Sequence, residues 1–91
     1  MTPQLLKDIR VRLLYLSQAE MADAFGVSQG TLSKWEAGTS GPDFKGMCRV
    51  RDALKGFGVD YPDEWFFAPP VDLSVEMIAK RSGKPLMGEA V

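Results

Sequence analysis

Apolar residues recur at intervals of three and four along the first part of the chain, which is the spacing of one face of an α-helix. In the N-terminal segment they are Leu5, Leu6, Ile9, Leu13 and Leu16. Thr2 and Pro3 supply an N-cap and a proline at the first helical position. The pattern therefore predicts an amphipathic helix over residues 3–15, with Arg10 and Arg12 mainly on its polar side.

Two short helices with clear capping signals come next. Ser17 and Glu20 have the spacing of a capping box, and Gly26 supplies the left-handed residue that suits a helix end. Ser28 is placed to cap a second helix over residues 29–36. The turn between the helices spans only Gly26 to Ser28, which forces them to cross steeply, as in a helix-turn-helix.

The rest of the chain predicts three further helical segments, separated by glycine and proline. The first covers residues 43–55. Its inward positions are Phe44, Met47, Val50 and Leu54. A short helix begins near residue 60 and carries an aromatic run over residues 65–67. A last helix is expected near residues 72–82, and residues 83–91 are expected to fray.

These segments predict an all-α fold in a chain of 91 residues, a length that suits one small domain. We expect a compact five-helix domain over residues 1–68. Residues 69–91 would form a C-terminal extension that holds one more helix, used for dimerisation or for binding a partner, and a frayed tail.

Composition excludes several classes of function. The chain has no histidine and a single cysteine, Cys48, so it offers no disulfide, no Cys/His zinc site and no histidine acid–base chemistry. We therefore expect neither an enzyme nor a bound cofactor or metal. No apolar run approaches the roughly 18 residues that cross a membrane. Residues 1–55 carry 8 basic and 6 acidic groups, whereas residues 56–91 carry 3 basic and 6 acidic groups. A polyanion-binding surface would thus belong to the front half.

The stretch from Leu16 to Gly38, LSQAEMADAFGVSQGTLSKWEAG, resembles the helix-turn-helix of the Cro/CI family, also called the XRE family. The positions that would face the core are Met21, Phe25, Val27, Leu32 and Trp35. The resemblance implies a lambda-repressor-like fold. It also implies that the helix over residues 29–36 lies in the major groove of DNA and that the preceding helix crosses the backbone. The segment 55–57 departs from the family as an insertion.

The outer face of this second helix carries side chains suited to reading bases. They are Gln29, Gly30, Ser33 and Lys34. Glutamine pairs with adenine, lysine donates to guanine, and serine serves either base, while glycine allows close approach. The alternative is an ordinary solvated helix face.

Two larger sets of residues complete the prediction. The expected phosphate contacts are Gln18, Ser28, Thr31, Thr39, Ser40, Lys45, Arg10 and Arg12. The expected dimer contacts are Trp65, Phe66, Phe67, Leu73, Met77 and Ile78, of which the three aromatic residues could instead belong to the core.

The sequence therefore predicts a sequence-specific regulator of transcription that binds double-stranded DNA. We expect a phage or bacterial repressor that binds an inverted-repeat operator as a homodimer. It would be cytoplasmic, and nucleoid-associated when bound to DNA. The alternative is an antitoxin whose segment 69–91 binds a toxin or another protein partner.

Overall fold

The computed structural model describes residues 1–87, and this part of the chain contains five α-helices, two irregular helical turns and no strand. The elements are α1 (Pro3–Asp8), the π-helical turn η1 (Ile9–Leu13), α2 (Gln18–Phe25), α3 (Gln29–Ala37), α4 (Phe44–Gly56), the 3₁₀ turn η2 (Asp63–Phe66) and α5 (Val75–Ser82). The predicted all-α class is confirmed.

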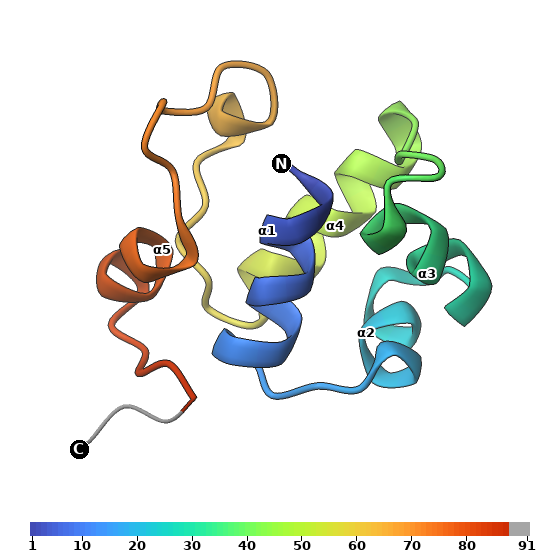
Figure 1. Cartoon of the computed structure of the whole chain (residues 1–91), viewed down its shortest axis with the longest axis horizontal. Helices are drawn as coiled ribbons and strands as arrows, with labels where there is room; N and C mark the ends of the chain where they lie inside the picture. Colours follow the sequence, from blue (N-terminus) through green and yellow to red (C-terminus); the bar gives the residue numbers. More distant parts are fainter. Residues whose placement is uncertain (88–91) are drawn as a thin grey trace.

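Helices α1 and α4 run through the middle of the molecule, with α2 and α3 on one side and α5 on the other (Figure 1). A single cluster of buried apolar side chains joins all of them. Its fully enclosed members are Ile9, Met21, Phe25, Leu32, Leu54 and Ile78. Helices α2 and α3 cover one end of this core. Because α3 lies at the edge of the molecule, its outer side faces solvent.

The predicted continuous helix over residues 3–15 is wrong beyond Asp8, because the chain continues as the π turn η1. The N–H of Leu14 donates to the carbonyl of Ile9, five residues back, at 2.9 Å. This wider turn carries Arg10 inward, where only 8% of it is exposed. Tyr15 then ends the segment with a φ of 58°, which is rare for a residue other than glycine.

The second half of the chain is less helical than predicted. A proline disfavours the helical conformation at the residue before it, and Pro62 itself has a non-helical ψ of 142°, so the expected helix from residue 60 is reduced to the single turn η2. Helix α5 begins at Val75 rather than near residue 72, because Ser74 caps it by accepting from the N–H of Met77 at 3.2 Å.

The segment after α5 packs on the body of the protein. Leu86 is 3% exposed, the N–H of Met87 donates to the carbonyl of Arg12 at 2.7 Å, and the hydroxyl of Tyr15 donates to the carbonyl of Pro85 at 2.7 Å. The expectation of fraying is therefore wrong for residues 83–87. The rest of the expected frayed tail, 88–91, lies outside the described residues.

Candidate nucleic-acid interface

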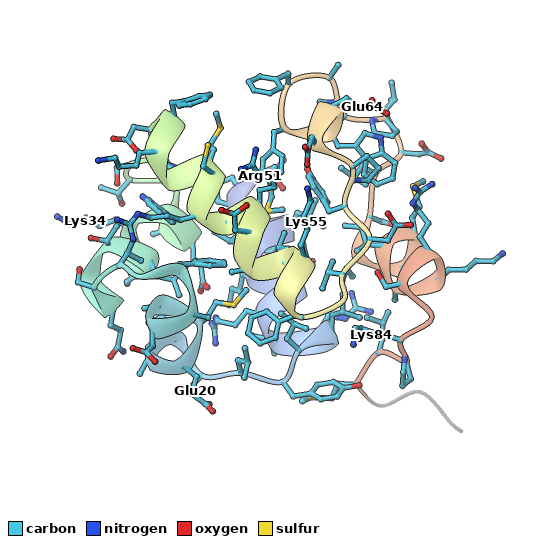
Figure 2. The ribbon with its side chains drawn as sticks, turned by 180° about the vertical axis from the view of Figure 1, so that it is seen from behind. Glu20, Lys34, Arg51, Lys55, Glu64 and Lys84 are labelled. Carbon is cyan, nitrogen blue, oxygen red and sulfur yellow. The ribbon has the colours of Figure 1, made fainter. Side chains whose placement is uncertain are left out.

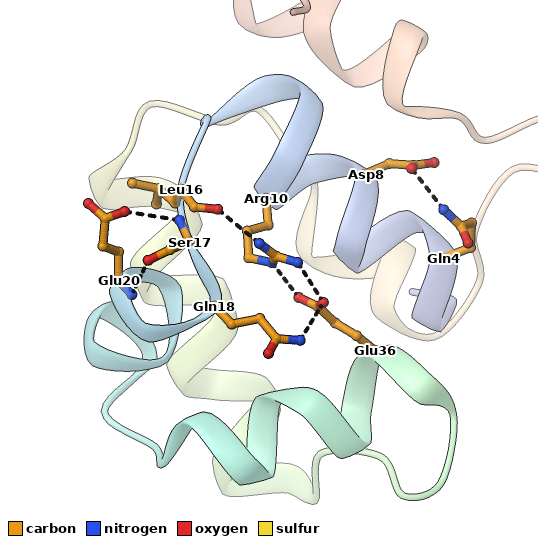
Figure 3. Close-up of polar contacts among 8 residues, drawn as sticks. All are labelled: Gln4, Asp8, Arg10, Leu16, Ser17, Gln18, Glu20 and Glu36. Carbon is orange, nitrogen blue, oxygen red and sulfur yellow. Dashed lines mark hydrogen bonds and ion pairs between the residues drawn. The ribbon is translucent and has the colours of Figure 1, made fainter.

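The α2–turn–α3 unit is held by local interactions. The Ser17 Oγ accepts from the N–H of Glu20 at 3.1 Å, and the Glu20 carboxylate accepts from the N–H of Ser17 at 3.0 Å (Figure 3). The bond from the Ser17 backbone is the main reason that the pKa of Glu20 is lowered. Gly26 ends α2 with a φ of 71°, and the Ser28 Oγ accepts from the N–H of Thr31 at 3.1 Å. The predicted caps and turn are confirmed.

The inner side of α3 fixes this helix to the core. Leu32 is completely buried and Trp35 is 7% exposed. The Trp35 ring lies against that of Phe25 on α2, with the two centroids 6.4 Å apart. This packing sets the direction of the opposite side of α3.

The opposite side of α3 presents its predicted base-contacting residues to solvent. All four are exposed, namely Gln29, Gly30, Ser33 and Lys34. Lys34 points away from the body of the fold (Figure 2). Within residues 1–87, the three side chains of this group make no hydrogen bond or ion pair with another residue. Their donors and acceptors are therefore available to a ligand.

A buried polar cluster joins η1, α2 and α3 (Figure 3). Arg10 donates from Nε to one oxygen of Glu36 at 2.7 Å and from Nη2 to the other at 2.9 Å. Gln18 donates to the second oxygen at 3.1 Å, and Arg10 Nη1 donates to the carbonyl of Leu16 at 2.9 Å. Burial opposes ionisation of Glu36, but the bonds from Arg10 and Gln18 outweigh it and lower the pKa of Glu36.

This cluster commits part of the predicted phosphate-contacting set to contacts within the fold. The Arg10 side chain is 10% exposed, and its guanidinium bonds Glu36 and the carbonyl of Leu16, which leaves little of it open to a phosphate; its predicted phosphate contact remains a prediction. Arg12 forms an ion pair at 3.1 Å with Glu76 of α5, and α5 lies on the opposite side of the molecule from α3 (Figure 1). Both arginines have acidic partners far along the sequence, which the helical pattern does not reveal. Gln18 is half-buried, and its amide is bonded to Glu36.

The other predicted phosphate contacts surround α3 at the surface. The hydroxyls of Ser28 and Thr31 lie 2.8 Å apart at the start of the helix. Thr39 and Ser40 are exposed in the loop after it, and Lys45 is exposed on the first turn of α4. Their position beside the outer face of α3 is compatible with the predicted role, which remains a prediction.

Arg49 is a further cation beside the turn that the sequence analysis missed. Its Nη1 donates to the carbonyl of Gly26 at 3.1 Å. The available signal is its spacing of four residues from Lys45, which places both cations on one face of α4. The apolar pattern of this helix does not draw attention to that face.

The predicted dimer contacts do not form one exposed surface. Ile78 is fully buried and Trp65 is 9% exposed, so both belong to the core of their own chain. The half-buried members of the set are Phe66, Leu73 and Met77. Phe67 alone among the six is exposed, at 73%. The inward position predicted for Phe44 is wrong, because it stands at the start of α4 with 72% of its surface exposed.

Residues 1–87 contain no group of acidic, cysteine or histidine side chains that could hold a metal ion. None of the helices in this part of the chain is long and apolar enough to span a membrane. Comparison with protein families gives a match over residues 6–55 to the family model described as "Helix-turn-helix". No curated protein and no solved structure matches the chain.

Proposed function

We propose a function for this chain from the family to which it belongs, the helix-turn-helix family of the Cro/CI (XRE) type. The protein is a sequence-specific regulator that reads double-stranded DNA with α3 in the major groove. The family match supports a DNA-binding regulator in general. The finer proposal is that the protein binds an inverted repeat as a homodimer and represses transcription. Repression by occupying an operator requires no activity beyond this binding.

The two-sided character of α3 carries the proposal. Leu32 and Trp35 fix one side of the helix in the core, while Gln29, Ser33 and Lys34 stand in solvent without partners in residues 1–87. A rigid helix with free amide, hydroxyl and ammonium groups on its outer side matches what the major groove offers, which is a distinct set of donors and acceptors at each base pair.

Selection of bound sites from random duplexes tests the reading of sequence. Recovery of one preferred site, followed by loss of preference at single base pairs in Gln29→Ala and Lys34→Ala, would support it. Each substitution should weaken binding to the preferred site by about 1–3 kcal/mol. Lys80→Ala is the matched control, because Lys80 is exposed on α5, across the molecule from α3. Wild-type discrimination in both α3 variants would overturn the proposal.

The size of the chain argues for two copies on the DNA. Recognition helices on two successive half-sites lie roughly 34 Å apart. The longest dimension of this molecule is only 34 Å, and the family match covers one helix-turn-helix. A single copy can therefore occupy one half-site, and a second copy is needed for the other.

The surface between α4 and η2 is the one that we propose for pairing. Phe44 and Phe67 stand exposed on either side of a hollow of 80 Å³, and Met47 and Phe66 line both this hollow and a neighbouring one of 390 Å³. Under a two-fold axis, Phe67 of each copy can enter a hollow of the other.

The charges around this surface also suit two identical copies. Arg51 and Lys55 lie on α4, whereas Asp63 and Glu64 lie on η2 (Figure 2). Lys55 and Asp63 are 3.7 Å apart within one chain. A two-fold axis through such a mixed patch can bring basic groups of one copy beside acidic groups of the other, which is the self-complementarity that an isologous interface requires.

Sedimentation of Phe67→Ser and Phe44→Ser tests the pairing surface. Both should shift the protein from dimer to monomer and should leave binding to a half-site duplex intact. Val71→Ser is the matched control, because Val71 is a fully exposed apolar residue outside this surface. If both phenylalanine variants sediment as the wild type does, pairing occurs elsewhere. A monomeric wild type at micromolar concentration would refute the homodimer.

The antitoxin alternative gains no support from the packing of the C-terminal segment. Val75, Ile78 and Leu86 belong to the core of their own chain. A segment that waits for a partner before folding would leave such residues exposed.

A further inference from the structure

A groove of 320 Å³ runs beside α3, between this helix and the start of α4. Thr31 lies on the α3 side of the groove, and Lys45 and Arg49 lie on the α4 side. Thr31 and Glu36 are five residues apart, about 140° around the helix. The groove therefore lies on the opposite flank of α3 from the buried cluster of Arg10, Gln18 and Glu36.

The two cations of this groove lie side by side without acidic partners, and Arg49 differs in this from the other arginines of residues 1–87. Within residues 1–87, neither Lys45 nor Arg49 has a carboxylate within 4 Å. The arginines elsewhere in this part of the chain are each paired with a carboxylate, namely Arg10, Arg12, Arg51 and Arg81. Asp43 also lines the groove, but its carboxylate accepts the N–H of Gly46 at 2.8 Å as the cap of α4. The groove keeps a net positive charge.

Arg49 is bonded to the turn of the helix-turn-helix. Its Nη1 donates to the carbonyl of Gly26 at 3.1 Å, and a Cβ on Gly26 would lie 2.5 Å from this nitrogen. A guanidinium has five N–H donors, so this one bond leaves others free. Arg49 is exposed, and those donors can meet a ligand in the groove.

We propose that this groove binds a phosphate of the DNA backbone, with Arg49 as the main ligand and Lys45 as the second. The proposal rests on the proposed function and adds a backbone contact on the far flank of α3. Guanidinium donors match phosphate oxygens in geometry as well as in charge. Because Arg49 also holds the carbonyl of Gly26, the same side chain ties the bound phosphate to the turn that sets the position of α3.

The salt dependence of DNA affinity tests this proposal. Affinity of the wild type, Arg49→Gln, Arg49→Lys and Lys45→Gln/Arg49→Gln is measured on the preferred duplex and on a scrambled duplex over a range of salt concentrations. The logarithm of the association constant falls as the logarithm of the salt concentration rises, and each lost phosphate contact should make this slope shallower by about 0.9. That change is equivalent to roughly eightfold weaker binding at 0.1 M salt. Arg49→Gln should weaken both duplexes equally, and Arg49→Lys should restore part of the slope.

Two controls make the result decisive. Lys80→Gln removes an exposed cation from α5 and should leave the slope unchanged. Urea unfolding of each variant establishes that the fold is retained. An unchanged slope in the folded double variant would overturn the phosphate site, while the proposed function would stand as long as α3 variants still lose sequence preference. A wild type that binds no duplex would instead refute the proposed function.

Discussion

Removing Glu36 should destabilise the protein far more than removing an ordinary surface carboxylate. The Glu36 side chain is 4% exposed and accepts three hydrogen bonds, two from Arg10 and one from Gln18. In Glu36→Ala the guanidinium of Arg10 stays buried, with the carbonyl of Leu16 as its remaining partner. Breaking a buried pair in this way costs about 3–5 kcal/mol, against a total stability of about 5–15 kcal/mol.

A double-mutant cycle of Arg10→Met, Glu36→Leu and the double variant separates the interaction energy of the pair from that of its surroundings. Arg10→Met/Glu36→Leu leaves no unpaired buried charge, so it should lose much less stability than Glu36→Ala, or gain some. Urea unfolding at pH 7 provides the free energies, and Asp23→Ala, an exposed carboxylate on α2, serves as the control with an expected change within about 0.5 kcal/mol. A loss below about 1 kcal/mol for Glu36→Ala, or costs that simply add in the double variant, would refute the reasoning.

Acid unfolding should also reveal the role of Glu36. The pKa of Glu36 is lowered from its ordinary 4.5, so the stability that its carboxylate contributes is complete above that pH and is lost as the pH falls through the lowered pKa. Acid unfolding of Glu36→Gln, followed by circular dichroism, should therefore show a weaker dependence of stability on pH over this range. Trp35→Ala should cost about 3–5 kcal/mol, and a thermal melt within a few degrees of the wild type would contradict its place in the core. Ile78→Ala should cost about 2–5 kcal/mol in urea unfolding, whereas Phe67→Ser should change the free energy of unfolding of the monomer by less than about 0.5 kcal/mol; equal losses would contradict the burial described. Truncation after Ala68 should produce a less stable, protease-sensitive chain, because it removes α5 and Leu86 from the core.

The sequence predicts best those features that arise within a few residues. The caps at Ser17 and Ser28 and the positive φ at Gly26 depend on neighbours at most three or four positions away. Their residue types leave few alternatives, since a hydroxyl satisfies helix N–H groups and glycine tolerates the left-handed region. The bounds of α2 and the start of α3 follow directly from these signals.

Features that depend on distant partners do not follow from the local sequence. The helical period places Arg10 on a polar face, but it does not reveal that Glu36, 26 positions away, enters the core with it. The same limit applies to apolar residues. Phe44 and Ile78 are equally hydrophobic candidates by pattern, yet one is exposed and the other enclosed. Ile78 is enclosed because α5 packs on η1, whereas Phe44 lies at the first position of α4, and the apolar pattern shows neither of these placements.

The position of α3 depends on polar contacts at both of its flanks as well as on the core beneath it. Glu36 ties one flank to η1 and α2, and Arg49 ties the turn before α3 to α4. Loss of the Glu36 contacts would displace the outer face of the helix without removing any group that reads DNA. A displaced face weakens every base contact together, and base contacts carry the sequence preference. Variants at Glu36 should therefore reduce the preference at all base pairs of the site together and change affinity for a scrambled duplex little, whereas variants at Gln29 or Lys34 should relax the preference at particular base pairs.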